Sequence, residues 1–480
     1  MVFCDINFPL LFCTVVNLIF GLTKFKMIIK GFNRTVYFCR FYSNRNILKI
    51  KDRGIIQDLF PDNAANIITD IMNANNQTVY AGFDPTAKSL HVGNLLVLIN
   101  LLHWQRGSHN VIAVIGGATA HIGDPSGRST EREAMSHISI EENIGGLKKN
   151  IETIFKNHEK YLWNGKDQLK PIKVLNNDDW YKQISATELI GKSGRHLRMG
   201  TLLSRSSVQT RLKSSAGMSF TEFSYQLFQA HDWLHLFETH KCCFQIGGND
   251  QMGNIMSGHE LISKVHNKPV YGLTIPLVTS EMGDKFGKSA GNAVWLDPEL
   301  TSPFTFYQFW IRQPDSEVEK FLKLFTFDTV GSISDLMRRH RETPELRLPQ
   351  KKLSEKMTLL VHGEEGLLKA EKAAKALYSG SVEALGEMNA EEIAKLFEGA
   401  TVVEILPKAG QSILDISMEA GCFPTIQDAV RIISAGGFSI NQRKVQNPSE
   451  IFNINAHMLS NKVSLFRVGK RNYYVVKLLY

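Results

Sequence analysis

Between residues 77 and 278, short apolar runs alternate with longer amphipathic ones, and this alternation constrains the fold more than any other feature. The order "TVYAGF", "LLVLINLLHW", "VIAVIGG" and "IEENIGGLKKNIETIF" predicts strand, helix, strand, helix. Such an order produces an α/β domain with a parallel sheet and crossover helices. Ligands of these sheets bind outside the carboxyl ends of the strands, so function is expected in the loops at that edge.

The net charge of +8 is concentrated at the two ends of the chain. Residues 1–50 contain seven Lys or Arg and one acid, and the stretch "MIIKGFNRTVYFCRFYSNRNILK" from Met27 contains no acid. A basic, acid-poor N-terminus is typical of an organellar transit peptide, and "RFYS" at 40–43 resembles a matrix-protease cleavage context. We expect a mitochondrial presequence over residues 1–50 and import into the mitochondrial matrix.

Two alternatives for this N-terminus stay open. The apolar run at residues 8–22 could be a secretory h-region, although its basic residues follow it and no small-residue cleavage site closes it. Alternatively, synthesis starts at Met27. The same run is too short, and too interrupted by Asn17, to predict a membrane span, so no stable membrane association is expected.

Two further domains follow the alternating part. From Ser302 to about Ala400 the runs are helical with charged faces, and after "EILPKAGQ" the pattern changes to short helices and strands. We expect a catalytic domain over 51–295, a helical domain over 296–405 and a small α+β domain over 412–480.

No metal or disulfide site is predicted. The six cysteines include no C-x-x-C pair. Cys242 and Cys243 come just before an apolar strand and are expected to be small core residues. Nor is there a carboxylate cluster that would hold Mg²⁺ without a ligand such as ATP.

Three loops at the expected sheet edge resemble phosphate-binding segments. "HVGN" at 91–94 opens a helix, whose unpaired N–H groups attract anions, and Gly93 permits a close approach to the backbone. His91 can donate a hydrogen bond to an oxyanion, although a capping role is an equal alternative. "EMGDKFGKS" at 281–289 is Gly-rich and cationic. "GGATAHIGDPSGR" at 116–128 follows a strand but matches neither the dinucleotide nor the P-loop motif.

Five ordered blocks together resemble the bacterial and organellar tyrosyl-tRNA synthetases, a branch of the class I aminoacyl-tRNA synthetases. They are "YAGFDPTAKSLHVGN", "GGATAHIGDPSGR", "SFTEFSYQLFQAHDWLHL", "QIGGNDQMGNI" and "TIPLVTSEMGDKFGKS". The resemblance implies a Rossmann-like parallel-sheet catalytic domain, a helical anticodon-side domain and a C-terminal RNA-binding domain. It also implies that L-tyrosine is joined to tyrosine tRNA through a tyrosyl-adenylate, with ATP as substrate, Mg²⁺ and release of pyrophosphate.

The resemblance assigns one group of residues to tyrosine. Tyr80 and Asp232 bind the phenol, Asp124 with Tyr225 and Gln229 holds the α-ammonium, and Gln251 lies near the carboxylate. The spacing of 225, 229 and 232 independently places those three side chains on one helix face.

A second group is assigned to ATP by the same resemblance. Gly82, Asp84 and Gly93 lie near its phosphates and ribose, Gly248 and Asp250 near the ribose, and the backbone of Leu277 and Val278 flanks the adenine. Thr86 and His91 bond the γ-phosphate, while Lys285, Lys288, Arg128 and Arg132 attract the leaving pyrophosphate. One departure is Asn94, which stands where many relatives have histidine but keeps the capacity for hydrogen bonds.

The C-terminal segment 422–446 resembles the small RNA-binding module of ribosomal small-subunit protein four. It opens with a capping pattern from Thr425 to Asp428, and Ala429, Val430 and Ile433 are expected to form its packing face. Candidate RNA contacts are Arg431, Arg443 and Lys444. A second basic stretch, residues 192–213, is either a solvated face or a contact for the tRNA acceptor arm. Relatives act as homodimers, which is expected here too.

Other functions are less well supported by the residues. A tryptophanyl enzyme would lack the pair Tyr80 and Asp232 as well as the C-terminal module. An inactive RNA-binding or intron-splicing factor on the same fold is disfavoured because the phosphate-handling residues are intact, although a second role of that kind stays open.

Overall fold

The computed structural model describes most of the chain. The described residues are 45–128, 130–215, 217–278, 292–379, 400–408, 410–469 and 472–479, with short stretches at 23–26, 35–38, 288–289, 385–386, 390 and 393–394. Within the expected presequence, strand β1 (Thr23–Lys26) pairs antiparallel with β2 (Thr35–Phe38). The described chain after it already belongs to the fold, because Ile47 is 4% exposed in the core, so the folded part begins before the predicted boundary at residue 51.

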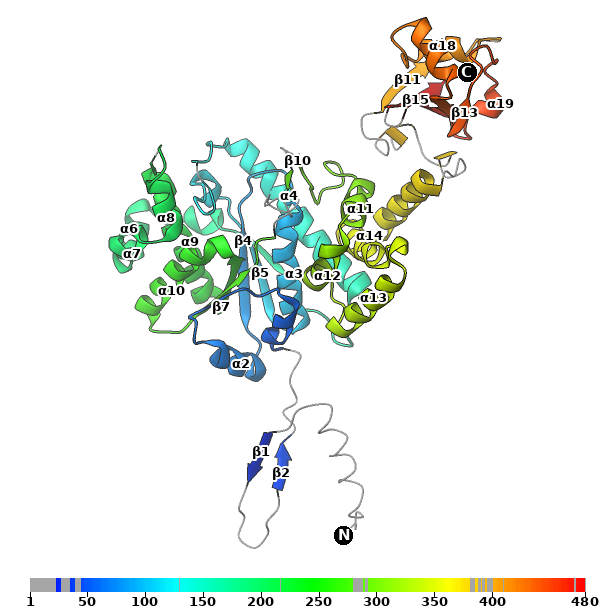
Figure 1. Ribbon diagram of the computed structural model, residues 1–480. Helices are drawn as coiled ribbons and strands as arrows, with labels where there is room; N and C mark the ends of the chain where they lie inside the picture. Colours follow the sequence, from blue (N-terminus) through cyan, green and yellow to red (C-terminus); the bar gives the residue numbers. More distant parts are fainter. Residues whose placement is uncertain are drawn as a thin grey trace.

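A six-stranded sheet forms the centre of the catalytic part, in the order β3-β8-β7-β4-β5-β6 (Figure 1). Every neighbouring pair is parallel except β3 with β8. The strands are β3 (Leu59–Phe60), β4 (Thr78–Phe83), β5 (Asn110–Ile115), β6 (Lys173–Asn176), β7 (Cys242–Gly248) and β8 (Tyr271–Ile275). Because the winding of the chain reverses between β4 and β7, a crevice is expected at the carboxyl ends of these two strands.

Helices cover both faces of this sheet, as the alternating pattern predicts. On one side are α3 (Val92–Arg106) and α4 (His137–Asn157), and on the other are α9 (Phe220–His240) and α10 (Met252–His266) (Figure 1). Shorter elements are η1 (Ile47–Arg53), α2 (Ala65–Ala74), η2 (Thr119–His121), η3 (His158–Leu162), α5 (Asp178–Tyr181), α6 (Ala186–Lys192), η4 (Gly194–His196), α7 (Met199–Leu203), α8 (Ser206–Leu212) and η5 (Asn249–Gln251). No helix in the described part of the chain has the length and apolarity needed to cross a membrane.

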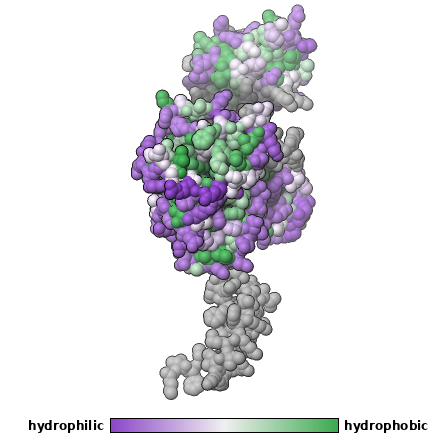
Figure 2. Space-filling view, turned by 90° about the vertical axis from the view of Figure 1, so that its left-hand side faces the viewer, coloured by the Kyte–Doolittle hydropathy of each residue, from purple (hydrophilic) through white to green (hydrophobic). Residues whose placement is uncertain are grey.

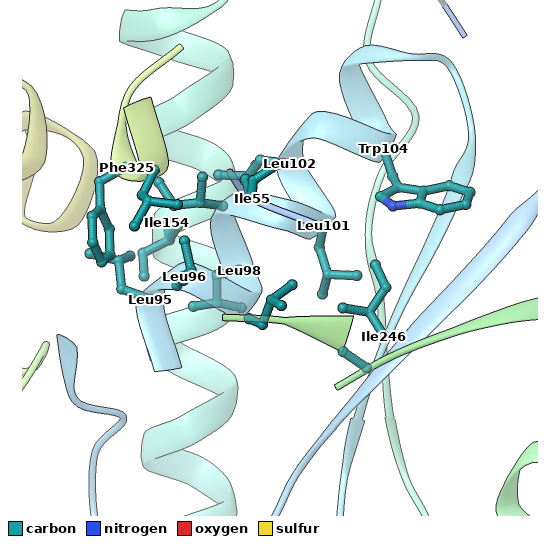
Figure 3. Close-up of a cluster of buried hydrophobic side chains, with 14 of the residues drawn as sticks. Ile55, Leu95, Leu96, Leu98, Leu101, Leu102, Trp104, Ile154, Ile246 and Phe325 are labelled. Carbon is teal, nitrogen blue, oxygen red and sulfur yellow. The ribbon is translucent and has the colours of Figure 1, made fainter. Parts of the chain in front are cut away.

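Two separate apolar cores lie on the two faces of the sheet, since successive side chains of a strand point to opposite faces. In β4, the side chains of Val79, Ala81 and Phe83 enter the core beneath α3 and α4, whereas Tyr80 enters the core beneath α9. Figure 3 shows the first core, where leucines of α3 pack against Ile154 of α4 and against Phe325.

The two adjacent cysteines belong to β7 rather than preceding it, which corrects the sequence-based placement. They are the first two residues of that strand. Cys242 is fully buried in the second core, as predicted, but Cys243 is only half-buried.

The predicted helical region contains α11 (Pro303–Ile311), α12 (Asp315–Phe325), α13 (Val330–Glu342), η6 (Pro344–Leu346) and α14 (Leu348–Ser379). Helix α14 is kinked at Gly363, whose φ of 69° only glycine adopts readily. Arg53 of η1 fastens this region to the N-terminal segment, because its guanidinium donates hydrogen bonds to carbonyl oxygens at the end of α12. The acceptors are Lys323 (2.8 Å), Leu322 (3.3 Å), Thr326 and Asp328.

The C-terminal domain is a five-stranded sheet of order β11-β15-β14-β12-β13 with short helices. Its elements are β11 (Thr401–Ile405), α17 (Ile413–Glu419), α18 (Ile426–Ser434), β12 (Phe438–Ile440), β13 (Arg443–Val445), α19 (Ile454–His457), β14 (Val463–Val468) and β15 (Asn472–Leu478). Because β11 pairs in parallel with β15, the domain includes Thr401–Ile405, and the predicted boundary after residue 405 is wrong. Thr425 caps α18 as predicted, and Ala429 and Ile433 are buried, but Val430 is 40% exposed and is not part of the packing face.

Candidate functional site

A cleft of about 510 Å³ opens where β4 and β7 end, which is the place that the reversal of winding predicts. All the residues assigned to tyrosine and ATP line it, together with most of those assigned to the phosphates. They are Tyr80, Gly82, Asp84, Thr86, His91, Gly93, Asp124, Arg128, Arg132, Tyr225, Gln229, Asp232, Gly248, Asp250, Gln251, Leu277 and Val278. Lys285 lies outside the described residues, and Lys288 is described only as backbone in β9 (Lys288–Ser289), which pairs with β10 (Asn292–Ala293).

One end of the cleft closes on the hydroxyl of Tyr80 and the carboxylate of Asp232. Both side chains are buried, and the Tyr80 hydroxyl has no hydrogen-bond partner among the described residues. Leaving a buried hydroxyl unsatisfied is unfavourable, so this position fits a polar group of a ligand. Burial raises the pKa of Asp232 to about 7, against the opposing effect of the hydrogen bonds it accepts. An aromatic slot ending in a hydroxyl and a carboxylate suits a phenol.

Two residues that the sequence analysis missed hold Asp232 in place. The Trp180 Nε1–H donates to Asp232 Oδ1 at 2.9 Å, and the Asn177 side-chain amide donates to Oδ2 at 3.2 Å. Both follow β6, whose carboxyl end lies at the same sheet edge as those of β4 and β5. The polar run "NDDW" directly after that strand was the available signal, because the same rule located the other loops.

The middle of the cleft is acidic. Tyr225 of α9 donates its hydroxyl hydrogen to Asp84 Oδ2 at 2.9 Å, and the Gln251 amide donates to Asp124 Oδ2 at 2.7 Å. Burial, and then repulsion from Asp124, raises the pKa of Asp84 to about 6. Two neighbouring carboxylates in a buried site favour a cationic ligand group such as an ammonium. Asp84, predicted only near ATP, therefore lies close to Tyr225 and Asp124, two residues assigned to the ammonium group.

Another wall of the cleft is formed by the N-terminus of α3, where His91 takes the capping role that is one of its two alternatives. His91 Nδ1 accepts a hydrogen bond from the Gly93 N–H at 3.0 Å, and Asn94 Oδ1 accepts one from the His91 N–H at 3.1 Å. This capping box gives the departure at Asn94 a structural role. His91 thus caps the helix and lines the cleft at once, and Arg128 and Arg132 line the same cleft.

The end of β7 supplies the opposite wall. A Cβ at Gly248 would lie 2.6 Å from Asp250 Oδ1 and 3.4 Å from Leu277 Cδ2, so a larger residue there would displace the Asp250 side chain. Leu277, which follows β8, is 48% exposed and presents an apolar surface to the cleft. Such a surface suits a flat ring like adenine.

The basic stretch 192–213 is not a single exposed face. Arg211 is 1% exposed and makes a bidentate pair with Glu222 of α9, with both N–O distances at 2.9 Å. Arg205 is largely buried 3.8 Å from Glu260. The exposed bases of the stretch are Lys192, Arg195, Arg198 and Lys213, so either a solvated face or an RNA contact would involve these residues and not Arg205 or Arg211.

The candidate RNA contacts of the C-terminal domain are all on its surface. Arg443 and Lys444 are exposed on β13, and Arg431 on α18 pairs with Asp428 at 2.7 Å. Among the residues that the structure describes, no group of three His, Cys, Asp or Glu side chains could hold a metal ion.

Residues 72–379, which include the cleft and every strand of the six-stranded sheet except β3, match the family model described as tRNA synthetases class I (W and Y). The chain belongs to this family. It is 55% identical over 442 residues to the mitochondrial tyrosine–tRNA ligase of Drosophila melanogaster, covering 91% of this chain and 95% of the relative. It is 46% identical to the Homo sapiens mitochondrial tyrosine–tRNA ligase over 434 residues, or 89% and 91% of the two chains.

A solved structure agrees with these sequence relatives. The C-terminally truncated mitochondrial tyrosyl-tRNA synthetase of Aspergillus nidulans superposes with a TM-score of 0.64 at 31% identity, covering 70% of this chain and 94% of that one. The relatives of high identity thus belong to the tyrosine branch of the family, as the five sequence blocks predicted.

Proposed function

We propose that this protein is a mitochondrial enzyme that joins L-tyrosine to tyrosine tRNA in two steps. The observation that carries this function is the buried pair of Tyr80 and Asp232, which closes the same cleft that contains the carboxylates and the N-terminus of α3. Its partners are tyrosine, ATP and tRNA, and the family to which it belongs supports the assignment. The finer location is the mitochondrial matrix, for which the basic N-terminus is the support.

The phenol of tyrosine binds between Tyr80 and Asp232, donating to the carboxylate and accepting from the Tyr80 hydroxyl. Phenylalanine would leave the Tyr80 hydroxyl buried without a partner and would not supply Asp232 with the hydrogen bond of the phenol. Enzymes that recognise tyrosine in this way reject phenylalanine by roughly 10⁴- to 10⁵-fold, an established value for this enzyme type that we expect to apply here. The ammonium group binds at Asp124, Tyr225 and Gln229.

In the first step, a carboxylate oxygen of tyrosine attacks the α-phosphorus of ATP, and the bond from that phosphorus to the bridging oxygen breaks to release pyrophosphate. The carboxylate is already a nucleophile, so the protein needs to position the reactants and stabilise charge. We assign Thr86 and His91 to the γ-phosphate, and Arg128, Arg132, Lys285 and Lys288 to the pyrophosphate. Mg²⁺ enters with ATP. In the second step, a hydroxyl of the terminal adenosine of tRNA attacks the tyrosyl carbonyl and AMP leaves.

The first step can be measured as ATP–pyrophosphate exchange, on the chain beginning near Ser43, with tyrosine, phenylalanine or tryptophan. We expect exchange with tyrosine alone and its loss in Lys288→Ala, because the lysine acts on the leaving group. Exchange with tryptophan would move the protein to the other branch of the family. Absence of exchange in a folded protein that still binds RNA would favour a splicing or scaffold role.

We further propose that the protein works as a homodimer through the face formed by α6 to α9. Large apolar side chains are exposed there, as the hydrophobic patches on this face in Figure 2 illustrate. They are Ile190 (56% exposed), Met199 (58%), Leu212 (45%) and Phe220 (78%). Exposed apolar patches of this kind mark association surfaces. Sedimentation of Met199→Glu and Phe220→Glu is expected to show monomers, and an unchanged dimer would locate the interface elsewhere.

A further inference from the structure

The loop that carries Thr86 and His91 is attached at both ends to one helix. At its start, the Asn143 side-chain amide of α4 donates a hydrogen bond to the Pro85 carbonyl oxygen at 2.9 Å. At its end, Asn150 Oδ1 accepts two hydrogen bonds, from the Leu90 N–H at 3.0 Å and from the Ser89 hydroxyl at 2.8 Å. Both asparagines are buried, at 4% and 6% exposure, so these contacts are shielded from water.

Between these two anchors the loop lies directly on the backbone of α4. A Cβ at Gly146 would overlap the carbonyl oxygen of Lys88, whereas a Cβ at the neighbouring Gly145 would have no heavy atom within 4 Å. Positions 143, 146 and 150 share one face of a helix, because they are three, four and seven residues apart. An ion pair between Lys88 and Glu142, with an N–O distance of 3.0 Å, reinforces the same contact at the surface.

The opposite side of the loop is fixed by residues 294–296, which follow the segment 281–289 in the sequence. The Leu296 N–H donates to the Leu90 carbonyl at 2.8 Å, and the Val92 N–H donates to the Val294 carbonyl at 2.9 Å. The loop is therefore held between α4 and residues 294–297, and the position of His91 depends on both.

We propose that Asn143, Gly146 and Asn150 are positioning residues for adenylate formation, which set the place of Thr86 and His91 from behind the cleft. The inference rests on the proposed function. None of the three residues lines the cleft, so their effect on the reaction passes through the loop. A displacement of about 1 Å in a catalytic group is enough to lower a rate roughly 100-fold. Contacts to ATP that form in the transition state are the ones that such a displacement weakens, so kcat should fall more than KM rises.

The adjacent glycines provide a matched test, because Gly145→Ala and Gly146→Ala make the same chemical change in the same helix. Gly146→Ala is expected to lower kcat for tyrosine-dependent exchange roughly 10- to 100-fold with KM for tyrosine nearly unchanged. Gly145→Ala should keep the wild-type kcat. Asn150→Ala should resemble Gly146→Ala, and Asn150→Asp, which keeps the acceptor oxygen, should recover part of the loss.

Amide hydrogen exchange of residues 86–92 gives a readout independent of catalysis, and it should accelerate in Gly146→Ala but not in Gly145→Ala. Equal kcat values and equal protection in the two alanine variants would overturn the inference. If the wild-type protein shows no tyrosine-dependent ATP–pyrophosphate exchange, the proposed function is refuted instead. The difference in amide protection between the two variants would still decide whether α4 positions the loop. Equal loss of kcat in both variants would show that α4 itself is perturbed, which also contradicts a role specific to position 146.

Discussion

At the scale of single residues, Asp232 has the property that most directly predicts a pH dependence. Its pKa is raised to about 7 by burial, so the free protein loses the ionised form as the pH falls below that value. The phenol of tyrosine donates its hydrogen to the ionised form. We expect kcat/KM for tyrosine to fall roughly tenfold per pH unit below about 7 and to level off above it.

Rates of ATP–pyrophosphate exchange measured between about pH 8 and pH 6.5 check this expectation. Above pH 6.5 Asp84, whose pKa is about 6, is mostly ionised and contributes little to the change. Asp232→Asn has no group to titrate at this position and should show a low but flat profile over the same range. A wild-type profile that is flat across this interval would mean that Asp232 stays ionised throughout.

Trp180 leads to a second prediction about the same carboxylate. Trp180→Phe keeps an aromatic ring but removes the N–H that donates to Asp232 Oδ1. A hydrogen bond to a charged group contributes about 1.5 to 3 kcal/mol, so kcat/KM for tyrosine should fall roughly 10- to 100-fold. Trp163→Phe is a suitable control, because the Trp163 N–H donates to the Asp167 carbonyl, away from the cleft. Equal activity of the two variants would show that the hydrogen bond from Trp180 to Asp232 does not contribute to tyrosine recognition.

The site residues differ in how far the sequence could predict them. Tyr225, Gln229 and Asp232 share a helix face, so their spacing alone places them together, and the structure brings all three to the cleft. Asn177 and Trp180 could not be assigned in this way, because their role depends on how β6 and α9 meet in three dimensions. The same holds for Arg211, whose buried partner Glu222 lies on a different helix.

At the scale of elements, the contact between η1 and α12 predicts a loss of stability. Arg53 is 6% exposed and donates to four carbonyl oxygens, three of them in or just after the last turn of α12. Arg53→Met would remove the guanidinium donor from all four carbonyl oxygens, of which Leu322 O still accepts from the Thr326 N–H and hydroxyl. We expect the free energy of unfolding to fall by about 3 kcal/mol, measured by urea denaturation. Lys51→Met, in the same segment but exposed, should leave it nearly unchanged, and equal stability of the two variants would contradict the proposed anchor.

The elements themselves were predictable where their pattern is strong. The strand and helix order from β4 to α4 is confirmed, because period and length distinguish the two types in this stretch. β11 was assigned to the wrong domain because its partner, β15, is at the far end of the chain. No local pattern in "TVVEI" contains that information, so pairing between distant strands sets a limit on this kind of prediction.

At the scale of the whole molecule, we expect tRNA binding to depend on the C-terminal domain and tyrosine activation to depend on the catalytic domain. Arg443→Glu with Lys444→Glu is expected to raise KM for tRNA at least about tenfold and to reduce the salt dependence of binding, since two phosphate contacts are lost. Tyrosine-dependent exchange should be unaffected, because the cleft contains no residue of this domain. Lys268→Glu, an exposed change on the catalytic domain, is the charge control. Unchanged tRNA charging in the double variant would assign RNA binding to other residues.

Strand β4 sends Tyr80 to one face of the sheet and Val79, Ala81 and Phe83 to the other, and this division has an evolutionary consequence. In the proposed assignment, Tyr80 and α9, which recognise the phenol, lie on one face of the sheet, and α4, which holds the loop of Thr86 and His91, lies on the other. A lineage can therefore replace one aromatic side chain by another through substitutions in a single layer, while it inherits the reaction unchanged. A family that serves both tryptophan and tyrosine is an outcome that this division permits.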